Sequence, residues 1–451
     1  KKVLILFVII LFLISCGKDD PADLTKTYEE LGTEFVELLA EENYDKIITK
    51  FDAIMKIALT KKKLKAAWEE QKSVYGDFEE IESVSRSKYQ TYEIVVVKAS
   101  FIKDGKTAYL DIKITYDAKK KVAGLFFIPS SGPKDYESVS YVDRSKFTEE
   151  EIVFGDQAWA LPGYLTIPKV EGPFPAVILV HGSGPNDRDE TLGPNKPFKD
   201  IAWGLSSSGI AVLRYDKRTM VYSEKVIENI HDFTVNEETI FDVISAVEFL
   251  AGDDRIDSNR IYVLGHSLGG MMIPKIASLT KHPAGFIIMA GTIRKLEDLT
   301  LEQVEHIAAA DGKVDAKEEK NINEIKKMIE KIKEIQKGKR MENPELILGA
   351  SNKYWIDFDE YDICRTAKMI KKPVFIIQGE RDYQVTMKDL ELWKECLTGL
   401  NNFTFKSYPA LNHIFIAGDG ICVPEEYFKP GHIAPEVIQD LINWINTNSG
   451  K

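Results

Sequence analysis

The sequence predicts a two-part chain, in which a small α+β domain precedes a larger α/β domain built on a mostly parallel, twisted sheet. Two changes in the spacing of apolar residues support this division: helical spacing gives way to alternation, and alternation gives way to strand and helix patterns in turn. The third observation is a long amphipathic insertion, at about residues 292–362, between two later strands. We therefore expect domains at 24–130 and 147–451, joined by a linker at 131–146.

The composition is that of a folded globular protein with an acidic surface. The 451 residues carry 59 Lys and Arg against 71 Asp and Glu, a net charge of −12, and 44% are hydrophobic. The negative excess disfavours binding to phosphate backbones, so nucleic acid is not an expected partner. His and Cys form no cluster at zinc-ligand spacing, so we expect no metal and no cofactor. The spacing of Cys364, Cys396 and Cys422 specifies no disulfide.

The first residues have the pattern of an export signal. Two lysines precede an apolar run at 3–15, which is too short to cross a bilayer core but has the length of a secretory h-region. The run ends in Leu-Ile-Ser before Cys16, and this resembles the lipobox of bacterial lipoproteins. The resemblance implies a signal peptide at 1–15, lipidation of Cys16, a tether at 16–23, and export to a bacterial cell membrane on which the lipid anchors the protein. The alternative is an ordinary signal peptide followed by a cysteine without special role.

In the first domain, helices are expected before an antiparallel meander. Apolar residues recur at helical spacing up to about residue 67, and alternating strands are expected at 92–97, 108–114 and 122–127. The order resembles the cone-shaped, cystatin-like domains of the nuclear-transport-factor type found in some bacterial lipoproteins. The resemblance implies a spacer or a partner surface; a ligand pocket is the alternative.

The second domain contains short apolar runs, as expected of strands that are covered on both faces. These runs are 176–180, 210–213, 261–264, 286–289 and 374–377, and the segment 403–408 is expected to be a final strand. Amphipathic segments such as 237–250 and 271–279 lie between them, and this order predicts parallel strands with right-handed crossovers. Because ligands bind beyond the carboxyl ends of such strands, we expect the chemistry there.

The insertion at 292–362 is too long for an ordinary strand–helix connection. Its middle, at 316–340, is rich in Lys and Glu and carries a helical stripe of Ile. At the carboxyl edge of a sheet it predicts a helical cap over the site, and a solvated helical ornament is the alternative. Aromatic residues at its end and in a later loop are candidates for a substrate pocket or for core packing: Tyr354, Trp355, Phe358, Tyr361 and Tyr383.

A nucleophile elbow is predicted at 265–269. The sequence Gly-His-Ser-Leu-Gly follows a strand pattern and opens a helical pattern, which is the context that such an elbow requires. Ser267 would lie at strained backbone angles, and Gly265 and Gly269 would let strand and helix approach closely. The N–H of Leu268 would then point to where an oxyanion forms. The alternative is a buried Ser in a tight turn.

A serine nucleophile needs a base and a carboxylate, in the chain order Ser, Asp, His. Asp382 follows the strand at 374–377, and His413 lies between the last strand and the last helix. Over about residues 151–445 the chain resembles the α/β-hydrolase fold of serine esterases and related peptidases. The resemblance implies that Ser267 is the nucleophile, that His413 is general base and acid, and that Asp382 orients the imidazolium.

Three other residues compete for these roles. Glu380 lies two positions before Asp382, and His432 is another downstream His near a loop. His266 adjoins the nucleophile and is expected to pack beside the elbow.

The second oxyanion donor is expected from the loop after the strand at 176–180. This loop begins with His-Gly, and we assign the donor to the backbone N–H of Ser183, with Gly184 as the second choice. The charged residues of the loop and the Asp-Lys-Arg run at 216–218 are expected to brace the loop by ion pairs.

Three motifs together resemble a bacterial subgroup of carboxylesterases: His-Gly-Ser-Gly-Pro-x-Asp-Arg-Asp at 181–189, Asp-Lys-Arg at 216–218, and Gly-His-Ser-Leu-Gly-Gly at 265–270. The resemblance implies hydrolysis of short-chain carboxylic esters through an acyl-enzyme, with a small ester as substrate. A serine peptidase or aminopeptidase of the same fold and a catalytically inert binding lipoprotein are the alternatives. The sequence does not specify an oligomeric state.

Overall fold

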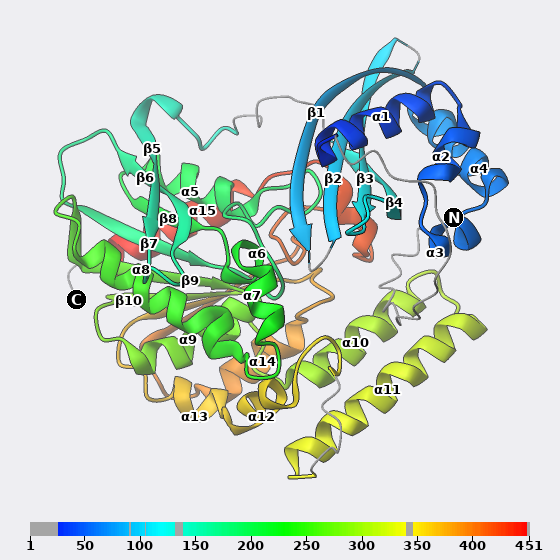
Figure 1. Ribbon diagram of the computed structural model, residues 1–451. Helices are drawn as coiled ribbons and strands as arrows, with labels where there is room; N and C mark the ends of the chain where they lie inside the picture. The colour runs from blue at the N-terminus through cyan, green and yellow to red at the C-terminus, as the bar shows by residue number, and fades with distance from the viewer. Residues whose placement is uncertain (1–25, 90–91, 104, 131–138, 340–345, 449–451) are drawn as a thin grey trace. The chain divides into compact units, whose positions relative to one another are not determined.

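The computed structural model describes residues 26–448 except 90–91, 104, 131–138 and 340–345 (Figure 1). The chain divides into two compact units, one ending at Glu137 and the other beginning at Ser138, and each has its own hydrophobic core. The expected signal segment, its lipidated Cys16 and half of the linker lie outside the described residues.

The first unit is an α+β domain in which four helices precede an antiparallel sheet. The helices are α1 (Tyr28–Ala40), α2 (Tyr44–Lys50), α3 (Ala53–Ala58) and α4 (Lys61–Tyr75), and the strands are β1 (Asp77–Tyr89), β2 (Tyr92–Lys103), β3 (Lys106–Tyr116) and β4 (Val122–Ser130). The strands pair in the order β1-β2-β3-β4, all antiparallel. Helix α1 packs closely on the sheet, because a Cβ added to Gly32 would lie 2.5 Å from Val95 Cγ1. This is the predicted meander with one further strand at its start.

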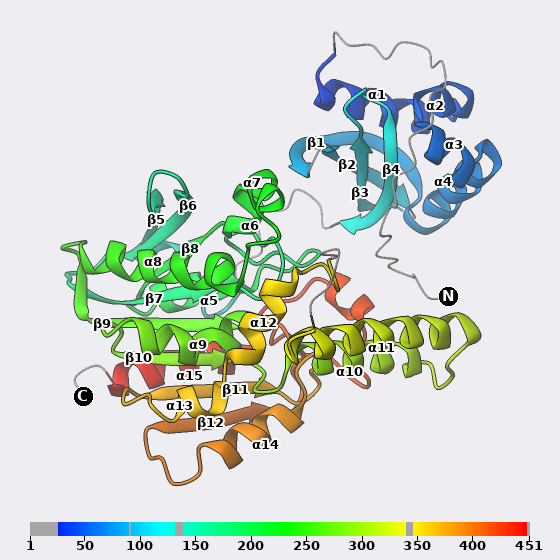
Figure 2. The ribbon, with the colours of Figure 1, turned by 60° about the horizontal axis from the view of Figure 1, so that its bottom comes forward.

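The second unit contains an eight-stranded sheet in the order β12-β11-β10-β9-β7-β8-β6-β5 (Figure 2). Its strands are β5 (Phe147–Phe154), β6 (Leu161–Pro168), β7 (Phe174–Val180), β8 (Ala211–Tyr215), β9 (Ile256–His266), β10 (Gly285–Met289), β11 (Val374–Gly379) and β12 (Phe403–Tyr408). The run from β12 to β8 is parallel, and β6 and β5 add antiparallel strands at one edge. The predicted α/β fold with a mostly parallel sheet is confirmed.

Helices cover both faces of this sheet. They include α5 (Pro197–Ser206), α8 (Phe241–Ala251), α9 (Leu268–Leu279), α14 (Met387–Cys396) and α15 (Pro435–Asn448), with the shorter α6 (Arg218–Val221), α7 (Ser223–Glu228) and α13 (Ile363–Ala367). Helices α5 and α15 lie on one face and α8 and α9 on the other (Figure 1). The segment expected as a helix at 237–250 begins with a π-helical turn, Asn236–Ile240, before α8.

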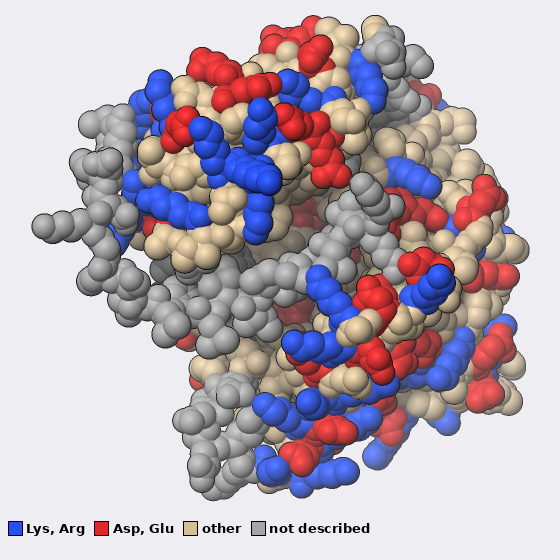
Figure 3. Space-filling view, turned by 90° about the vertical axis from the view of Figure 1, so that its right-hand side faces the viewer, with Lys and Arg blue, Asp and Glu red and all other residues tan. Residues whose placement is uncertain are grey.

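The described part of the insertion contains the helices α10 (Leu296–Ala309), α11 (Ala316–Gln336) and α12 (Asn352–Glu360). Helices α10 and α11 lie side by side as an antiparallel hairpin (Figure 2). The Ile stripe of α11 is largely buried, and Lys326–Glu305 (2.9 Å) and Lys333–Asp298 (2.7 Å) pair the two helices on their exposed sides. Acidic and basic side chains are accordingly interspersed on the face that Figure 3 shows.

The structure pairs two of the cysteines whose spacing specified no bond. Cys364 in α13 and Cys396 at the end of α14 form a disulfide with their Cα atoms 5.9 Å apart, and Cys422 is a buried free thiol. No helix among the described residues combines the length and the apolar character needed to cross a bilayer.

Candidate active site

Ser267 forms a sharp turn between β9 and α9. Its backbone angles are φ 53° and ψ −116°, a region that side-chain-bearing residues rarely adopt. The N–H of Ser267 donates to the carbonyl of Met289 (2.9 Å), which ties the turn to the neighbouring strand β10. Ser267 is half-buried while the residues on either side are buried, so the turn presents its side chain at the carboxyl edge of the sheet.

Two glycines allow this turn to form. A Cβ on Gly265 would lie 2.3 Å from the carbonyl oxygen of Gly269, and a Cβ on Gly269 would lie 2.4 Å from that of Val180. Both distances are far below van der Waals contact, and both involve backbone. The elbow therefore requires glycine at both positions.

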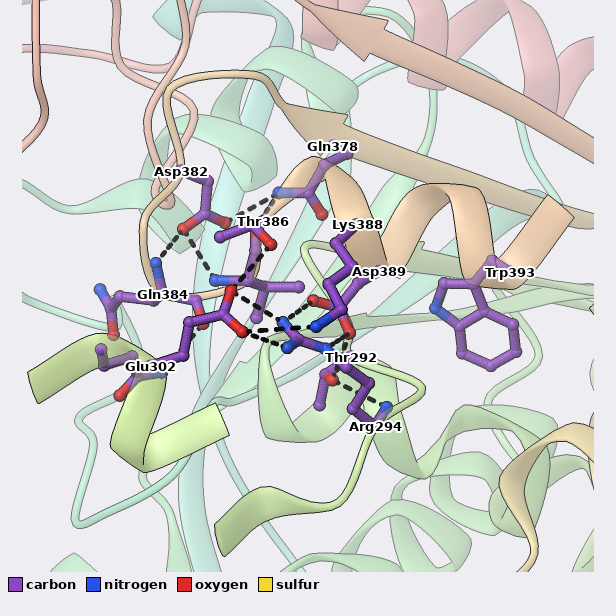
Figure 4. Close-up of polar contacts among 12 residues, drawn as sticks. Thr292, Arg294, Glu302, Gln378, Asp382, Gln384, Thr386, Lys388, Asp389 and Trp393 are labelled. Atoms are coloured by element: carbon purple, nitrogen blue, oxygen red, sulfur yellow. Dashed lines mark hydrogen bonds and ion pairs between the residues drawn. The ribbon is translucent and has the colours of Figure 1, made fainter. Parts of the chain in front are cut away.

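The structure brings Asp382 and His413 together. His413 Nδ1 lies 2.7 Å from Asp382 Oδ2, and both side chains are almost fully buried. The carboxylate is further fixed by three donors: Gln378 Nε2 on Oδ2 (2.9 Å), and the N–H groups of Gln384 (2.8 Å) and Val385 (3.0 Å) on Oδ1 (Figure 4). With Nδ1 engaged, Nε2 is the ring nitrogen that remains for proton transfer.

His266, which precedes Ser267 in the elbow, contacts the loop that carries His413. The His266 and His413 rings lie 4.7 Å apart, and His266 Nε2 lies 3.0 Å from the backbone carbonyl of His413. Within the part of the chain that the structure describes, the Ser267 hydroxyl makes no hydrogen bond. Such catalytic contacts are often long in free enzymes and tighten when substrate binds.

The competing residues have other partners. Glu380 is exposed and accepts a hydrogen bond from the Ser407 hydroxyl (2.7 Å). His432 Nδ1 lies 3.1 Å from Asp200 Oδ1. The carboxylate that pairs with His413 is Asp382.

His266 forms a buried ion pair with a residue that sequence reasoning missed, Glu190. His266 Nδ1 lies 2.9 Å from Glu190 Oε2. Burial opposes the charge on the ring, but the Glu190 carboxylate outweighs it and raises the pKa of His266. Burial likewise opposes the charge on Glu190, and His266 together with the N–H of Gly182 lowers the pKa of Glu190. The only sequence signal was the position of Glu190 directly after the charged loop motif.

The loop that follows β7 lies against Ser267. A Cβ on Gly182 would lie 3.1 Å from Ser267 Cβ and 3.6 Å from Ser267 Oγ. The Gly182 N–H donates to Glu190 Oε1 (2.7 Å), whereas the N–H of Ser183 has no partner among the described residues. Burial lowers the pKa of His181, at the base of the loop, to about 4, so this ring is neutral at pH 7.

Ion pairs brace this loop from β8 and the segment after it. Arg188 NH2 lies 2.6 Å from Asp216 Oδ2, and Arg214 Nε lies 2.9 Å from Asp189 Oδ1. The Arg214 side chain is only 2% exposed, which makes its pairing part of the core.

Of the aromatic residues predicted for the pocket, Tyr361 is half-buried and the other four are buried. The Tyr354 hydroxyl donates to Glu238 Oε2 (2.6 Å), Trp355 Nε1 donates to the carbonyl of Ile347 (2.9 Å), and Tyr383 stacks on His306. Phe358 lines a cavity of about 310 Å³ that Met271, one turn along α9 from Ser267, also borders. The Tyr361 hydroxyl accepts from the N–H of Lys275 (3.0 Å). Contact of these residues with substrate stays a prediction.

A polar network ties the Asp382 loop to α10 of the insertion (Figure 4). Arg294 donates to Asp389 (2.7 Å) and to Glu302 of α10, and the Thr386 hydroxyl donates to Glu302 (3.2 Å). Gln303 Nε2, also on α10, donates to the carbonyl of Gln384 (3.0 Å). The described residues contain no group of three or more His, Cys, Asp or Glu side chains placed to hold a metal.

Comparison with known proteins gives two family matches. Residues 173–418 match the family described as serine aminopeptidase, S33, and residues 32–125 match a protein family of unknown function, DUF3887. Among solved structures, esterase PF2001 of Pyrococcus furiosus aligns at 18% identity over 66% of this chain and 92% of its own, with a TM-score of 0.41. Est1E of Butyrivibrio proteoclasticus aligns at 15% identity over 67% of this chain and 99% of its own, with a TM-score of 0.43.

A curated relative covers both units. Esterase EstD of Thermotoga maritima is 41% identical over 413 residues, which are 91% of this chain and 93% of that protein. An alignment of this length covers most of both units. This chain therefore belongs to the α/β-hydrolase family of serine esterases.

Proposed function

We propose that the protein hydrolyses short-chain carboxylic esters, with Ser267 as nucleophile, His413 as general base and acid, and Asp382 as the carboxylate that orients His413. The observation that carries this proposal is the buried His413–Asp382 pair (2.7 Å), placed beside the strained elbow that presents Ser267. The order and spacing of the three residues and the 41% identity to an esterase support it.

The reaction has two halves. Ser267 Oγ attacks the acyl carbon while His413 Nε2 takes the hydroxyl proton, and the resulting oxyanion accepts hydrogen bonds from the N–H groups of Leu268 and Ser183. The C–O bond to the alcohol then breaks, and the alcohol leaves with the proton from His413. In the second half, water attacks the acyl-enzyme by the same steps. The carboxylic acid is released and the free Ser267 hydroxyl is restored.

Asp382→Asn tests the role of the carboxylate. Because two backbone N–H groups face Oδ1, the introduced NH₂ must take the place of Oδ2, where it meets the Gln378 amide and forces His413 to carry its proton on Nε2. In that tautomer the ring cannot accept the Ser267 proton, and we expect kcat for nitrophenyl butyrate to fall by about 10⁴-fold. Glu380→Gln is the control, with kcat expected to stay unchanged. A loss of kcat in Glu380→Gln together with an unchanged kcat in Asp382→Asn would assign the role to Glu380.

The nucleophile is tested by Ser267→Ala and by fluorophosphonate labelling. We expect the variant to lose turnover by about 10⁶-fold and the wild type to gain one adduct, on Ser267. A folded wild type that gains no adduct would instead be an inert binding protein.

The match to a family described as a serine aminopeptidase makes amide hydrolysis the second candidate. The same triad cleaves amides, so the fold does not decide between the two reactions. We expect kcat/KM to be higher for nitrophenyl butyrate than for aminoacyl anilides, and higher for butyrate than for long acyl chains. A preference for the anilides would overturn the esterase assignment.

We further propose that the protein is exported and held on the membrane by a lipid on Cys16. The apolar run that ends at Cys16 supports this proposal. Expressed in a bacterium, the Cys16→Ser variant is expected to leave the membrane fraction or to keep its signal segment. Cys422→Ser is the control and is expected to stay in the membrane fraction. Equal distribution of the two variants would refute the anchor.

A further inference from the structure

We propose that Lys217 positions the oxyanion hole: its ammonium binds the carbonyl of Gly182 and thereby turns the N–H of Ser183 toward Ser267. The inference rests on the proposed function and assigns a positioning role to a residue that does not touch substrate. It also gives the cap helix α12 a route to the reaction centre.

The contact between Lys217 and the loop is direct and buried. Lys217 Nζ donates to the carbonyl oxygen of Gly182 at 2.7 Å, and the Lys217 side chain is only 2% exposed. Asn186 Nδ2 lies 3.2 Å from the same oxygen, and 3.1 Å and 3.3 Å from the carbonyl oxygens of Ser183 and Gly184. The loop carbonyls therefore converge on cationic and amide donors.

The direction of the Ser183 N–H follows from peptide geometry. A trans peptide points its C=O and its N–H to opposite sides, so a donor that holds the Gly182 carbonyl also sets the direction of the Ser183 N–H. The preceding peptide is held as well, because the Gly182 N–H donates to Glu190 Oε1 (2.7 Å). A carboxylate and an ammonium thus fix the two peptides that flank Gly182, which lies against the Ser267 side chain.

Glycine makes such fixing necessary. Without a Cβ, Gly182 has a wide choice of backbone angles, and the peptide that follows it can rotate at little cost. An oxyanion hole stabilises the transition state only if its donors are already oriented, because reorientation during the reaction costs free energy. Lys217 supplies that orientation with a charge-assisted hydrogen bond.

Lys217 is itself held by Glu238, and Glu238 is in turn held by α12. Lys217 Nζ donates to Glu238 Oε1 (2.6 Å), and Glu238 Oε2 accepts from the Tyr354 hydroxyl (2.6 Å), which belongs to α12. Three consecutive hydrogen bonds therefore connect α12 to the Gly182 carbonyl. The side chains of Tyr354, Glu238 and Lys217 are all buried, so water does not compete for these hydrogen bonds.

The decisive experiment compares two buried ion pairs that are neighbours in sequence. Lys217→Met/Glu238→Leu removes the first pair without leaving a buried charge unpaired, and such replacements are often neutral for stability. Arg218→Met/Asp242→Leu does the same for the adjacent pair, which has no contact with the loop among the described residues. Both variants and the wild type are assayed with nitrophenyl butyrate and with a butyl trifluoromethyl ketone, whose adduct with Ser267 is an oxyanion.

We expect the Lys217/Glu238 variant to lose about 30- to 300-fold in kcat with little change in KM, and the ketone to bind more weakly by the same factor as the loss in kcat/KM. The Arg218/Asp242 variant is expected to stay within about threefold of the wild type. Equal kcat values for the two variants, or a rise in KM alone, would overturn the inference. Absence of ester turnover in the wild type would instead overturn the proposed function.

Tyr354→Phe is the milder second variant, because it keeps the ring and removes only the hydroxyl. We expect kcat to fall about three- to tenfold for every acyl length alike, since the oriented donor serves each ester equally. A change confined to KM or to one acyl length would show that Tyr354 lines the substrate pocket and does not act through Glu238 and Lys217.

Discussion

At the scale of single residues, the geometry of Ser267 predicts a conflict between stability and activity. With φ at 53° and ψ at −116°, a residue with a Cβ is strained by about 1–3 kcal/mol, and glycine is not. Glycine also loses more conformational entropy on folding than alanine does, which lowers the free energy of unfolding by about 0.5–1 kcal/mol and offsets part of this gain.

We therefore expect Ser267→Gly to be more stable than Ser267→Ala by about 1 kcal/mol, while neither variant turns over ester. The two free energies of unfolding can be compared by urea denaturation at one pH. The Ala variant is the matched control, because both changes remove the hydroxyl. Equal stability, or a more stable Ala variant, would mean that the elbow stores no strain.

The Glu190–His266 pair predicts a pH dependence of stability. The pKa of His266 is raised, so its contribution is full below its unfolded value of about 6.5 and is lost as pH rises through the folded pKa. The pKa of Glu190 is lowered, so its contribution is full above about 4.5 and is lost as pH falls through its folded pKa. Asp382 and His413 also face the His266 ring. Both residues are present in the wild type and in the Glu190→Gln variant that tests the pair.

We expect Glu190→Gln to destabilise the protein most at pH 5–6, where both partners are charged, and least at pH 9. The difference in Tm between wild type and variant, measured from pH 5 to pH 9, checks this expectation. A difference that does not change with pH would show that Glu190 acts only as a hydrogen-bond acceptor for Gly182.

Sequence reasoning proposed residues that a motif or a chain order marks, and missed buried residues that contact them in the structure. Ser267, Asp382 and His413 each follow a strand pattern, which is why their places at one sheet edge could be predicted. Glu190 and Gln378 are single polar residues with no period or motif of their own. Their roles depend on which backbone N–H or side chain lies opposite them, and only the folded chain settles that.

At the scale of elements, the disulfide between α13 and α14 predicts a redox effect on stability. The bond joins cysteines 32 positions apart in sequence, and the segment that it closes contains β11 and Asp382. Closing a loop of this length lowers the conformational entropy of the unfolded chain. This stabilises the folded protein by about 3–4 kcal/mol.

We expect Cys364→Ser/Cys396→Ser to lower Tm by about 5–10 °C in calorimetry or fluorescence melts. Dithiothreitol should lower the Tm of the wild type toward that of the variant and leave the variant unchanged. If the reductant lowers both alike, it acts elsewhere in the protein.

The sequence predicted the strands in which every residue is buried. It missed strands in which buried and exposed residues are mixed. The parallel strands from β7 to β11 were predicted as apolar runs, and β7 is buried along its whole length. Strands β5 and β6 lie at the sheet edge, where β5 is half-exposed, so β5 has no continuous apolar run. The disulfide escaped prediction because its cysteines are distant in sequence and meet only when β11 is in the sheet.

At the scale of the whole molecule, the two units have separate cores, and the candidate site residues lie in the second unit. The site residues fall within 181–413, all beyond Ser138, where the second unit begins. The groups assigned to the proposed reaction are therefore all residues of the second unit.

A truncated protein of residues 138–451 is expected to keep kcat/KM for nitrophenyl butyrate within about twofold of the full chain, because the reacting groups are unchanged. Calorimetry of the full chain should show two transitions, of which the truncated protein keeps one. A tenfold loss of activity on truncation would assign part of the site to the first unit.

The crowding at the elbow has a consequence for how this enzyme can diversify. Gly265 and Gly269 each face a backbone oxygen at less than 2.5 Å from an added Cβ, whereas Gly105 and Gly312 face open space. In a saturation library under selection for growth on an ester, the codons of the first two are expected to stay invariant, while those of the other two drift, with asparagine most frequent because it tolerates a positive φ. New specificities must then arise around an immovable centre, through the loops and the cap.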